Sequence, residues 1–178
     1  QLAWLTAAHH SDKVRSLTVL SRPHPAAFAQ AFRVDEGQAE RSKHHKVFHD
    51  PATVGLLVAD DARRLRRMLT SNGVPTAAAD AYVSVLGQPD ALEAAINWYR
   101  ATPPTGLRAI DTPAVTTPTL YLWGTDDHSV GRTAAELTAD HVTGPYRLVE
   151  LDGGGHFLTD DGRSEVVTEA LLGHLAAT

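Results

Sequence analysis

Two ionisable side chains follow two strand-like runs near the end of the chain. The apolar run 119–123 leads through a glycine to Asp127, and the run 146–151 leads through glycines 153–155 to His156. A carboxylate beside an imidazole Nδ1–H fixes the tautomer and leaves Nε2 free to act as a base. The glycines let the backbone turn tightly, so the imidazole can be aimed from a short loop. The pattern predicts an acid–histidine pair of the kind that activates a nucleophile or a water molecule.

Each of these residues alone has a simpler interpretation. Asp127 could cap a helix that begins near Val130, and His156 could be an ordinary loop histidine. Their order in the chain, and their equivalent positions after two strands, favour the pair. Asp126 is a second candidate for the acid, and Asp152 is a third because it lies on the histidine side.

Strands that alternate with helices must position these side chains. A third β-rich run at 14–21 is stopped by two prolines and is flanked by helical patterns at 1–10 and 26–34. Helical patterns at about 130–142 and 161–176 follow the two runs that lead to the ionisable residues. This spacing predicts parallel strands with crossover helices, and side chains with chemical roles collect at the carboxyl ends of such strands.

The stretch from about 38 to 100 has a different character, because it contains no strand signal. Helical segments are expected there at roughly 38–48, 51–57, 59–71, 75–86 and 89–100. Prolines near the helix starts and glycines near the ends mark the boundaries. A linker at 102–106 separates this all-helical insertion from the strands that follow.

The composition describes a globular chain of 178 residues with 43% hydrophobic and 21% charged residues and a net charge of −5. The basic cluster 63–67 follows two aspartates and is interpreted as a solvated helix face, so we expect no nucleic-acid partner. No run approaches the length of about 18 apolar residues that would span a bilayer. The chain has no cysteine, which excludes disulfides and thiolate chemistry and is consistent with a cytoplasmic enzyme.

Two further patterns carry weaker signals. His45 and His49 stand four residues apart beside Asp50, a spacing that can hold zinc, but no third ligand is marked and a polar helix face is the better interpretation. Trp98 and Tyr99 lie on a predicted helix. One interpretation makes them core aromatics; in the other, the phenol of Tyr99 donates a hydrogen bond into a cavity.

Several of these segments together resemble the α/β-hydrolase family, in its epoxide hydrolase and haloalkane dehalogenase branch. The segment 14–28 is similar to the strand and His-Pro loop that follow the nucleophile helix, and 38–100 is similar to the cap domain. Leu122-Trp-Gly-Thr-Asp-Asp127 resembles the acid strand, and Gly155-His156-Phe157 resembles the histidine loop. The resemblance runs along essentially the whole chain.

This resemblance implies roles for individual residues. The family's carboxylate falls three residues after the glycine, which favours Asp127 over Asp126. Tyr99 inherits the role of one of two ring-opening tyrosines. The segment where the second is expected contains none, and His44, near that position, would donate in its place. The substrate pocket would be lined partly by Phe28, Trp98 and Phe157.

We therefore expect an α/β fold, the C-terminal part of an α/β-hydrolase parallel sheet with a helical cap insertion. The expected divisions are core at 1–37, cap at 38–106 and core with the acid and histidine at 107–178. The family's nucleophile stands in a G-x-D-x-G or G-x-S-x-G turn, which does not occur here, and the chain begins in the middle of a helix without Met. The nucleophile is therefore expected upstream of Gln1, and the isolated chain is expected to be inactive.

The implied activity is that of an epoxide hydrolase-like enzyme, in which the His156–Asp127 pair activates the water that hydrolyses a covalent intermediate. An esterase, a haloalkane dehalogenase or a non-catalytic binding protein of the same fold are the alternatives. The implied substrate is a small apolar epoxide, ester or haloalkane, with no metal and no organic cofactor. The expected partner is the missing N-terminal half or a second copy of the chain, and neither nucleic acid nor a membrane.

Overall fold

A three-stranded parallel sheet lies at the centre of one part of the molecule. The computed structural model describes residues 1–101, 111–160 and 162–178, so the linker expected at 102–106 lies outside the described residues. The strands are β1 (Leu17–Leu20), β2 (Thr119–Gly124) and β3 (Tyr146–Leu151), in the order β1-β2-β3. Both pairings are parallel. The parallel arrangement that the spacing predicted is confirmed.

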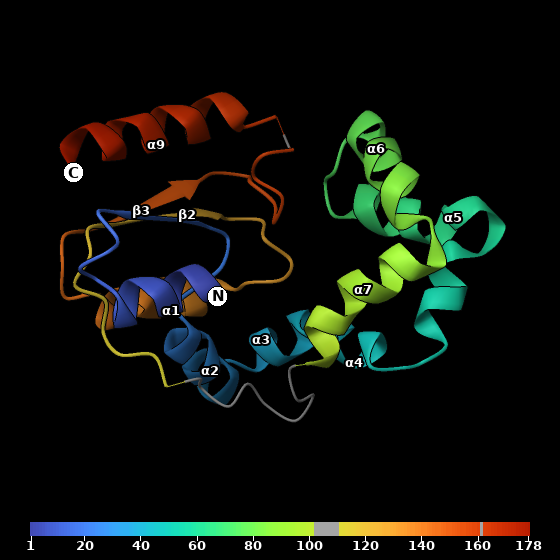
Figure 1. Ribbon diagram of the computed structural model, residues 1–178, viewed down its shortest axis with the longest axis horizontal. Helices are drawn as coiled ribbons and strands as arrows, with labels where there is room; N and C mark the ends of the chain where they lie inside the picture. Colours follow the sequence, from blue (N-terminus) through green and yellow to red (C-terminus); the bar gives the residue numbers. More distant parts are fainter. Residues whose placement is uncertain (102–110, 161) are drawn as a thin grey trace.

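Helices cover both faces of this sheet. Figure 1 shows α9 (Ser164–Ala177) on one side of the strands, with α1 (Leu2–His9) and α2 (Pro25–Val34) on the other. Every residue of β2 is buried. Leu120 and Leu122 pack toward α9, while Tyr121 and Trp123 belong to the cluster on the opposite face. This near-continuous apolar strand is typical of a parallel sheet that is covered on both sides.

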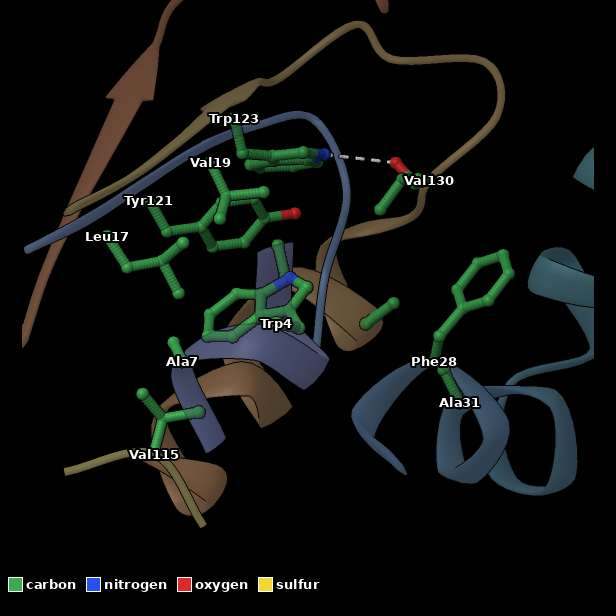
Figure 2. Packing of buried hydrophobic residues seen from close by; sticks show 12 residues of the cluster. Trp4, Ala7, Leu17, Val19, Phe28, Ala31, Val115, Tyr121, Trp123 and Val130 are labelled. Carbon is green, nitrogen blue, oxygen red and sulfur yellow. Dashed lines mark hydrogen bonds between the residues drawn. The ribbon is translucent and has the colours of Figure 1, made fainter. Parts of the chain in front are cut away.

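Two tryptophans anchor the face that carries α1, as Figure 2 shows. Trp4 is fully buried and its indole N–H donates to the Arg22 carbonyl over 3.0 Å. The indole of Trp123 donates to the Val130 carbonyl over 3.1 Å. Each ring therefore buries a large apolar surface and satisfies its one polar atom on the backbone of a loop that follows a strand. These contacts hold the two loops at the carboxyl edge of the sheet.

A group of helices lies beside the sheet in Figure 1 and has its own apolar cluster. It comprises α3 (Glu36–Arg41), α4 (His44–Phe48), α5 (Thr53–Ser71), α6 (Thr76–Leu86) and α7 (Pro89–Arg100). Leu65, Ala79 and Ile96 are among its buried members. Phe157, next to the site histidine, packs against the same cluster. The division of the chain into core and cap stays a prediction.

Buried Gln38 connects these helices to the loop after β2. Its amide nitrogen donates to the Ser42 hydroxyl over 3.1 Å and to the Ser129 carbonyl over 2.9 Å. Its amide oxygen accepts from the Gly131 N–H over 2.9 Å. A fully buried amide of this kind is tolerated because its donors and its acceptor find partners.

Several predicted helix boundaries were wrong. The helix expected at 38–48 is two helices, because α3 ends at Arg41 and α4 begins at His44. The side chain of Gln38 reaches the hydroxyl of Ser42 between them. By contrast, the two separate segments expected at 51–57 and 59–71 are supported, because the backbone at 59–62 inside α5 is not helical and divides it into two helical stretches.

The helix expected at 130–142 begins later than predicted and changes type. It is α8 (Arg132–Glu136) followed by the 3₁₀ turn η1 (Leu137–His141). Buried Thr138 receives the His24 N–H there and donates to the Ala134 carbonyl. Tertiary contacts of this kind, invisible in a periodic pattern, decide where such short helices stop. Within the described residues, no helix combines the length and the apolar character needed to cross a membrane.

Candidate active site

His156 and Asp127 meet at the carboxyl edge of the sheet. The imidazole Nδ1 lies 2.8 Å from the carboxylate Oδ2, and the two residues come from the loops that follow β3 and β2. An ionised carboxylate only accepts, so Nδ1 carries the proton and donates it, and Nε2 keeps its lone pair. The structure thus brings together the two side chains that the sequence predicted would meet.

The carboxylate of Asp127 is held from both sides. Its Oδ1 accepts from the backbone N–H groups of Ser129 and Val130, over 2.7 and 2.9 Å, while Oδ2 accepts from the imidazole. Its side chain is fully buried. The interpretation of Asp127 as a helix cap is wrong, because the helix that follows begins at Arg132 and its N-cap is Gly131; Oδ1 instead holds the turn before that helix. The competing candidates, Asp126 and Asp152, are exposed.

The two loops are joined to each other through their backbones. The Asp126 N–H donates to the Gly154 carbonyl over 2.9 Å, and the Gly153 N–H donates to the Thr125 hydroxyl over 2.8 Å. Gly153 has a φ of 64°, a left-handed conformation that glycine adopts without strain. These hydrogen bonds fix the distance between the acid and the histidine before any substrate is present.

Two supporting residues had not been recognised in the sequence. The Ser21 hydroxyl, directly after β1, donates to the His156 carbonyl over 2.8 Å. The Arg41 guanidinium donates to the Asp127 carbonyl over 2.8 Å. The position of Ser21 at the carboxyl end of a parallel strand was a usable signal, whereas nothing in the local pattern around Arg41 indicated its partner.

His156 lines two adjoining cavities of about 270 and 220 Å³. Both also contain His44, Tyr99 and Ser129 in their walls. Phe28 and Trp98 line the first cavity, and Phe157 lines the second. All the side chains expected to surround a substrate therefore lie around His156. Trp98 is 59% exposed, so its interpretation as a core aromatic is wrong.

Tyr99 lies between the two cavities, on α7. Its ring packs against Phe48 at 4.6 Å between ring centres, with His44 at 6.2 Å. Burial raises the pKa of the Tyr99 phenol, and the positive charge of Arg22 acts against this shift. The phenol therefore stays protonated at neutral pH and is able to donate a hydrogen bond.

The interpretation of 45–49 as a polar helix face is wrong for His45. Its half-buried ring lies 5.3 Å from that of Tyr99 and lines the first cavity. Burial, assisted by the neighbouring charge of His44, lowers the pKa of His45 to about 4, so the ring is neutral near pH 7. Among the described residues, no group of three potential metal ligands is found.

A parallel sheet covered by helices, with an acid and a histidine presented at its strand ends, defines the α/β-hydrolase class. The comparison with protein families agrees. The family model described as the alpha/beta hydrolase fold matches residues 1–162, so the chain belongs to this family.

Curated relatives include epoxide hydrolases. The chain is 31% identical over 170 residues to mouse epoxide hydrolase 4, covering 90% of this chain and 47% of the relative. It is 29% identical to epoxide hydrolase A of Mycobacterium tuberculosis, covering 96% of this chain and 64% of the relative. The chain thus spans about half the length of the mouse relative and under two thirds of the mycobacterial one.

Solved structures of similar fold include an epoxide hydrolase of Bacillus megaterium in complex with an inhibitor. It superposes with a TM-score of 0.80 at 17% identity, covering 97% of this chain and 64% of that structure. A structure described as a novel epoxide hydrolase from metagenomes of hot environments gives a TM-score of 0.79 at 24% identity, covering 99% of this chain and 64% of that structure. At these identities the two superpositions show the fold alone.

Proposed function

We propose that this chain supplies the acid, the histidine and a hydrogen-bond donor of an epoxide hydrolase whose nucleophile lies outside residues 1–178. The observation that carries the proposal is the 2.8 Å contact between His156 and Asp127 beside cavities that also hold the Tyr99 phenol. Several relatives are named as epoxide hydrolases, which supports the same reaction. Neither G-x-D-x-G nor G-x-S-x-G occurs in the sequence, which supports a nucleophile contributed from elsewhere in the whole protein.

The proposed reaction has two steps. A carboxylate nucleophile attacks one epoxide carbon, the ring C–O bond breaks, and the oxygen takes the proton of Tyr99. The Nε2 of His156 then removes a proton from water, and the resulting hydroxide attacks the ester carbonyl, which releases the diol and restores the carboxylate. The imidazolium returns a proton to the phenolate, so the net change is addition of one water.

Asp127 acts through His156 in this scheme. It keeps the proton on Nδ1, so that Nε2 can accept, and it stabilises the imidazolium that forms. Tyr99 acts on the ring oxygen, where a well-placed donor contributes about 3 kcal/mol of transition-state stabilisation. Burial keeps this donor protonated, because it raises the pKa of the phenol.

The hydrogen bonding of His44 argues against its use as a second donor. Its Nδ1 lies 3.0 Å from the Arg41 carbonyl, which only accepts, so the proton is on Nδ1 and Nε2 is an acceptor. Burial lowers the pKa of His44, which favours the neutral ring. We therefore propose His44 as a substrate-binding side chain and Tyr99 as the donor.

Hydrolysis of an aryl epoxide by the whole protein tests this function. Wild type should form the diol, His156→Ala should lose multiple turnover, and Tyr99→Phe should lose about 100-fold in kcat. His10→Ala, at an exposed histidine outside the site, is the matched control and should behave as wild type. Turnover that survives His156→Ala would refute the assigned base.

The nucleophile distinguishes this function from its alternatives. An aspartate in the elbow of the whole protein supports epoxide or carbon–halogen chemistry, and a serine supports an esterase. A whole protein that forms no product from an epoxide, an ester or a haloalkane would support the non-catalytic alternative.

A further inference from the structure

Arg22 lies in the wall of the first cavity together with His156 and Tyr99. It follows Ser21 directly at the end of β1, and its carbonyl is held by the Trp4 indole over 3.0 Å. Its guanidinium carbon lies 4.4 Å from the centre of the Phe28 ring. Stacking on an aromatic face is a favourable place for a guanidinium, and it leaves the N–H groups at the edge of the plane available to a ligand.

No carboxylate neutralises Arg22 among the residues that the structure describes. The described residues that line this cavity include no Asp or Glu. The acid in the site, Asp127, uses its two oxygens to accept from Ser129, Val130 and His156. Charged side chains in poorly solvated places are normally paired, because their desolvation is costly.

The charge of Arg22 reaches the other groups around the cavity. It contributes to lowering the pKa of His44 and of His45, in both cases after the larger effect of burial. It also acts against the burial that raises the pKa of the Tyr99 phenol. Among the described residues of the cavity wall, no side chain offsets the positive potential of Arg22.

We propose that Arg22 binds a carboxylate of the substrate, so that the enzyme prefers epoxides that carry an acid group. The inference rests on the proposed function and narrows its substrate class. A guanidinium presents paired N–H donors in one plane, which matches the two oxygens of a carboxylate. The aryl or alkyl part of the same substrate would pack against Phe28 and Trp98 in the wall of the cavity.

A pair of matched epoxides tests the proposal in the whole protein. Styrene oxide is neutral, and styrene oxide with a 4-carboxylate differs from it by one anionic group. The readout is the ratio of kcat/KM for the anionic epoxide to that for the neutral one. We expect Arg22→Met to lower this ratio about 30-fold, since hydrogen bonds to a charged group contribute on that scale.

Two further variants separate recognition from loss of structure. Arg22→Lys keeps the charge but not the planar fork, so the ratio should fall by an intermediate factor. Arg15→Met removes an exposed arginine before the same strand and should leave the ratio unchanged. An equal loss on both epoxides in Arg22→Met would show a structural role and overturn the proposal. A wild-type ratio below one would also overturn it, because the charge would then be neutralised by a carboxylate of the protein outside residues 1–178.

Calorimetric titration with benzoate provides a readout that does not need turnover. Benzoate should bind wild type at least tenfold more tightly than Arg22→Met, and added salt should weaken the wild-type affinity. If benzoate binding depends on Arg22 but the protein hydrolyses neither epoxide, the proposed function is refuted while carboxylate binding by Arg22 is supported. Equal benzoate affinity in wild type and Arg22→Met would refute carboxylate binding by Arg22, whatever the rates of epoxide hydrolysis.

Discussion

Gly124, the last residue of β2, touches Gly154 in the loop that carries His156. A β-carbon on Gly124 would come within 2.2 Å of the Gly154 carbonyl oxygen and 2.7 Å of the Gly155 carbonyl oxygen. The atoms that this β-carbon would meet belong to the backbone of Gly154 and Gly155, so no side-chain rotation can relieve the clash. The acid loop and the histidine loop therefore approach each other closely only because this position has no side chain.

Gly124→Ala should separate the two loops. We expect a loss of about 2–3 kcal/mol in the free energy of unfolding, the cost of overpacking a tightly packed site, together with a large loss of kcat. Urea denaturation and a rate assay on the whole protein measure the two effects. Gly173→Ala is the matched control, because its β-carbon meets nothing within 4 Å and lies in exposed helix, where alanine gains about 0.5–1 kcal/mol. Wild-type stability and rate in Gly124→Ala would contradict the described contact.

Ser21 should position His156 through the backbone. Its hydroxyl donates to the His156 carbonyl, and its φ of 56° is a left-handed conformation that costs a residue such as serine about 1 kcal/mol. Ser21→Ala keeps the strain and loses the hydrogen bond, so kcat should fall and the Nδ1 proton of His156 should exchange faster in NMR spectra. Asparagine tolerates this conformation and retains a polar group, so Ser21→Asn should recover part of kcat and part of the protection of the Nδ1 proton from exchange. A rate unchanged in Ser21→Ala would rule out this role.

His24 should make stability depend on pH. Its ring is fully buried and stacks on His141 at 4.7 Å, and burial, assisted by His141, lowers the pKa of His24 to about 4. The unfolded chain has the ordinary value of about 6.5, so it binds a proton below that pH that the folded chain does not bind. The free energy of unfolding should therefore fall as pH drops from about 6.5 to 4, by up to about 3 kcal/mol, and be insensitive to this group above 6.5.

Chemical denaturation at several pH values checks this dependence. His45 acts in the same direction, because its pKa is also lowered to about 4, so the comparison must be between wild type and a variant. His24→Asn retains a side-chain acceptor for the Ala26 N–H and does not titrate. The pH dependence should be weaker in this variant. Equal slopes in the two proteins would show that His24 is not the group responsible.

The sequence predicted best those parts of the site that depend on a regular element. The run that became β2 is apolar and ends in glycine, and the run that became β3 is followed by glycines 153–155, so the rule for strand ends was enough to place Asp127 beside His156. The helical segments and the break inside α5 could be located, but not the ends of α3 and α8, because Gln38 and Thr138 act through partners far away in the chain. Periodicity contains no information about such contacts.

Two side chains of the site, His45 and Arg22, were missed because their surroundings also depend on tertiary packing. His45 stands on α4, a helix of five residues whose orientation depends on how α3 ends and how α7 packs, so its exposure could not be read from its neighbours. Arg22 stands before two prolines in a loop, where a charged residue usually points into solvent. Only the packing of its guanidinium on Phe28 shows that it faces the cavity.

The central claim, that His156 activates the water that releases a covalent intermediate, is tested most directly by the intact mass of the whole protein after mixing with an epoxide. In His156→Ala, the first step proceeds and the second does not, so the mass should increase by that of one epoxide and persist, while wild type and His10→Ala should return to the mass of the free protein. Continued formation of diol by His156→Ala, with no adduct at any time, would contradict the account.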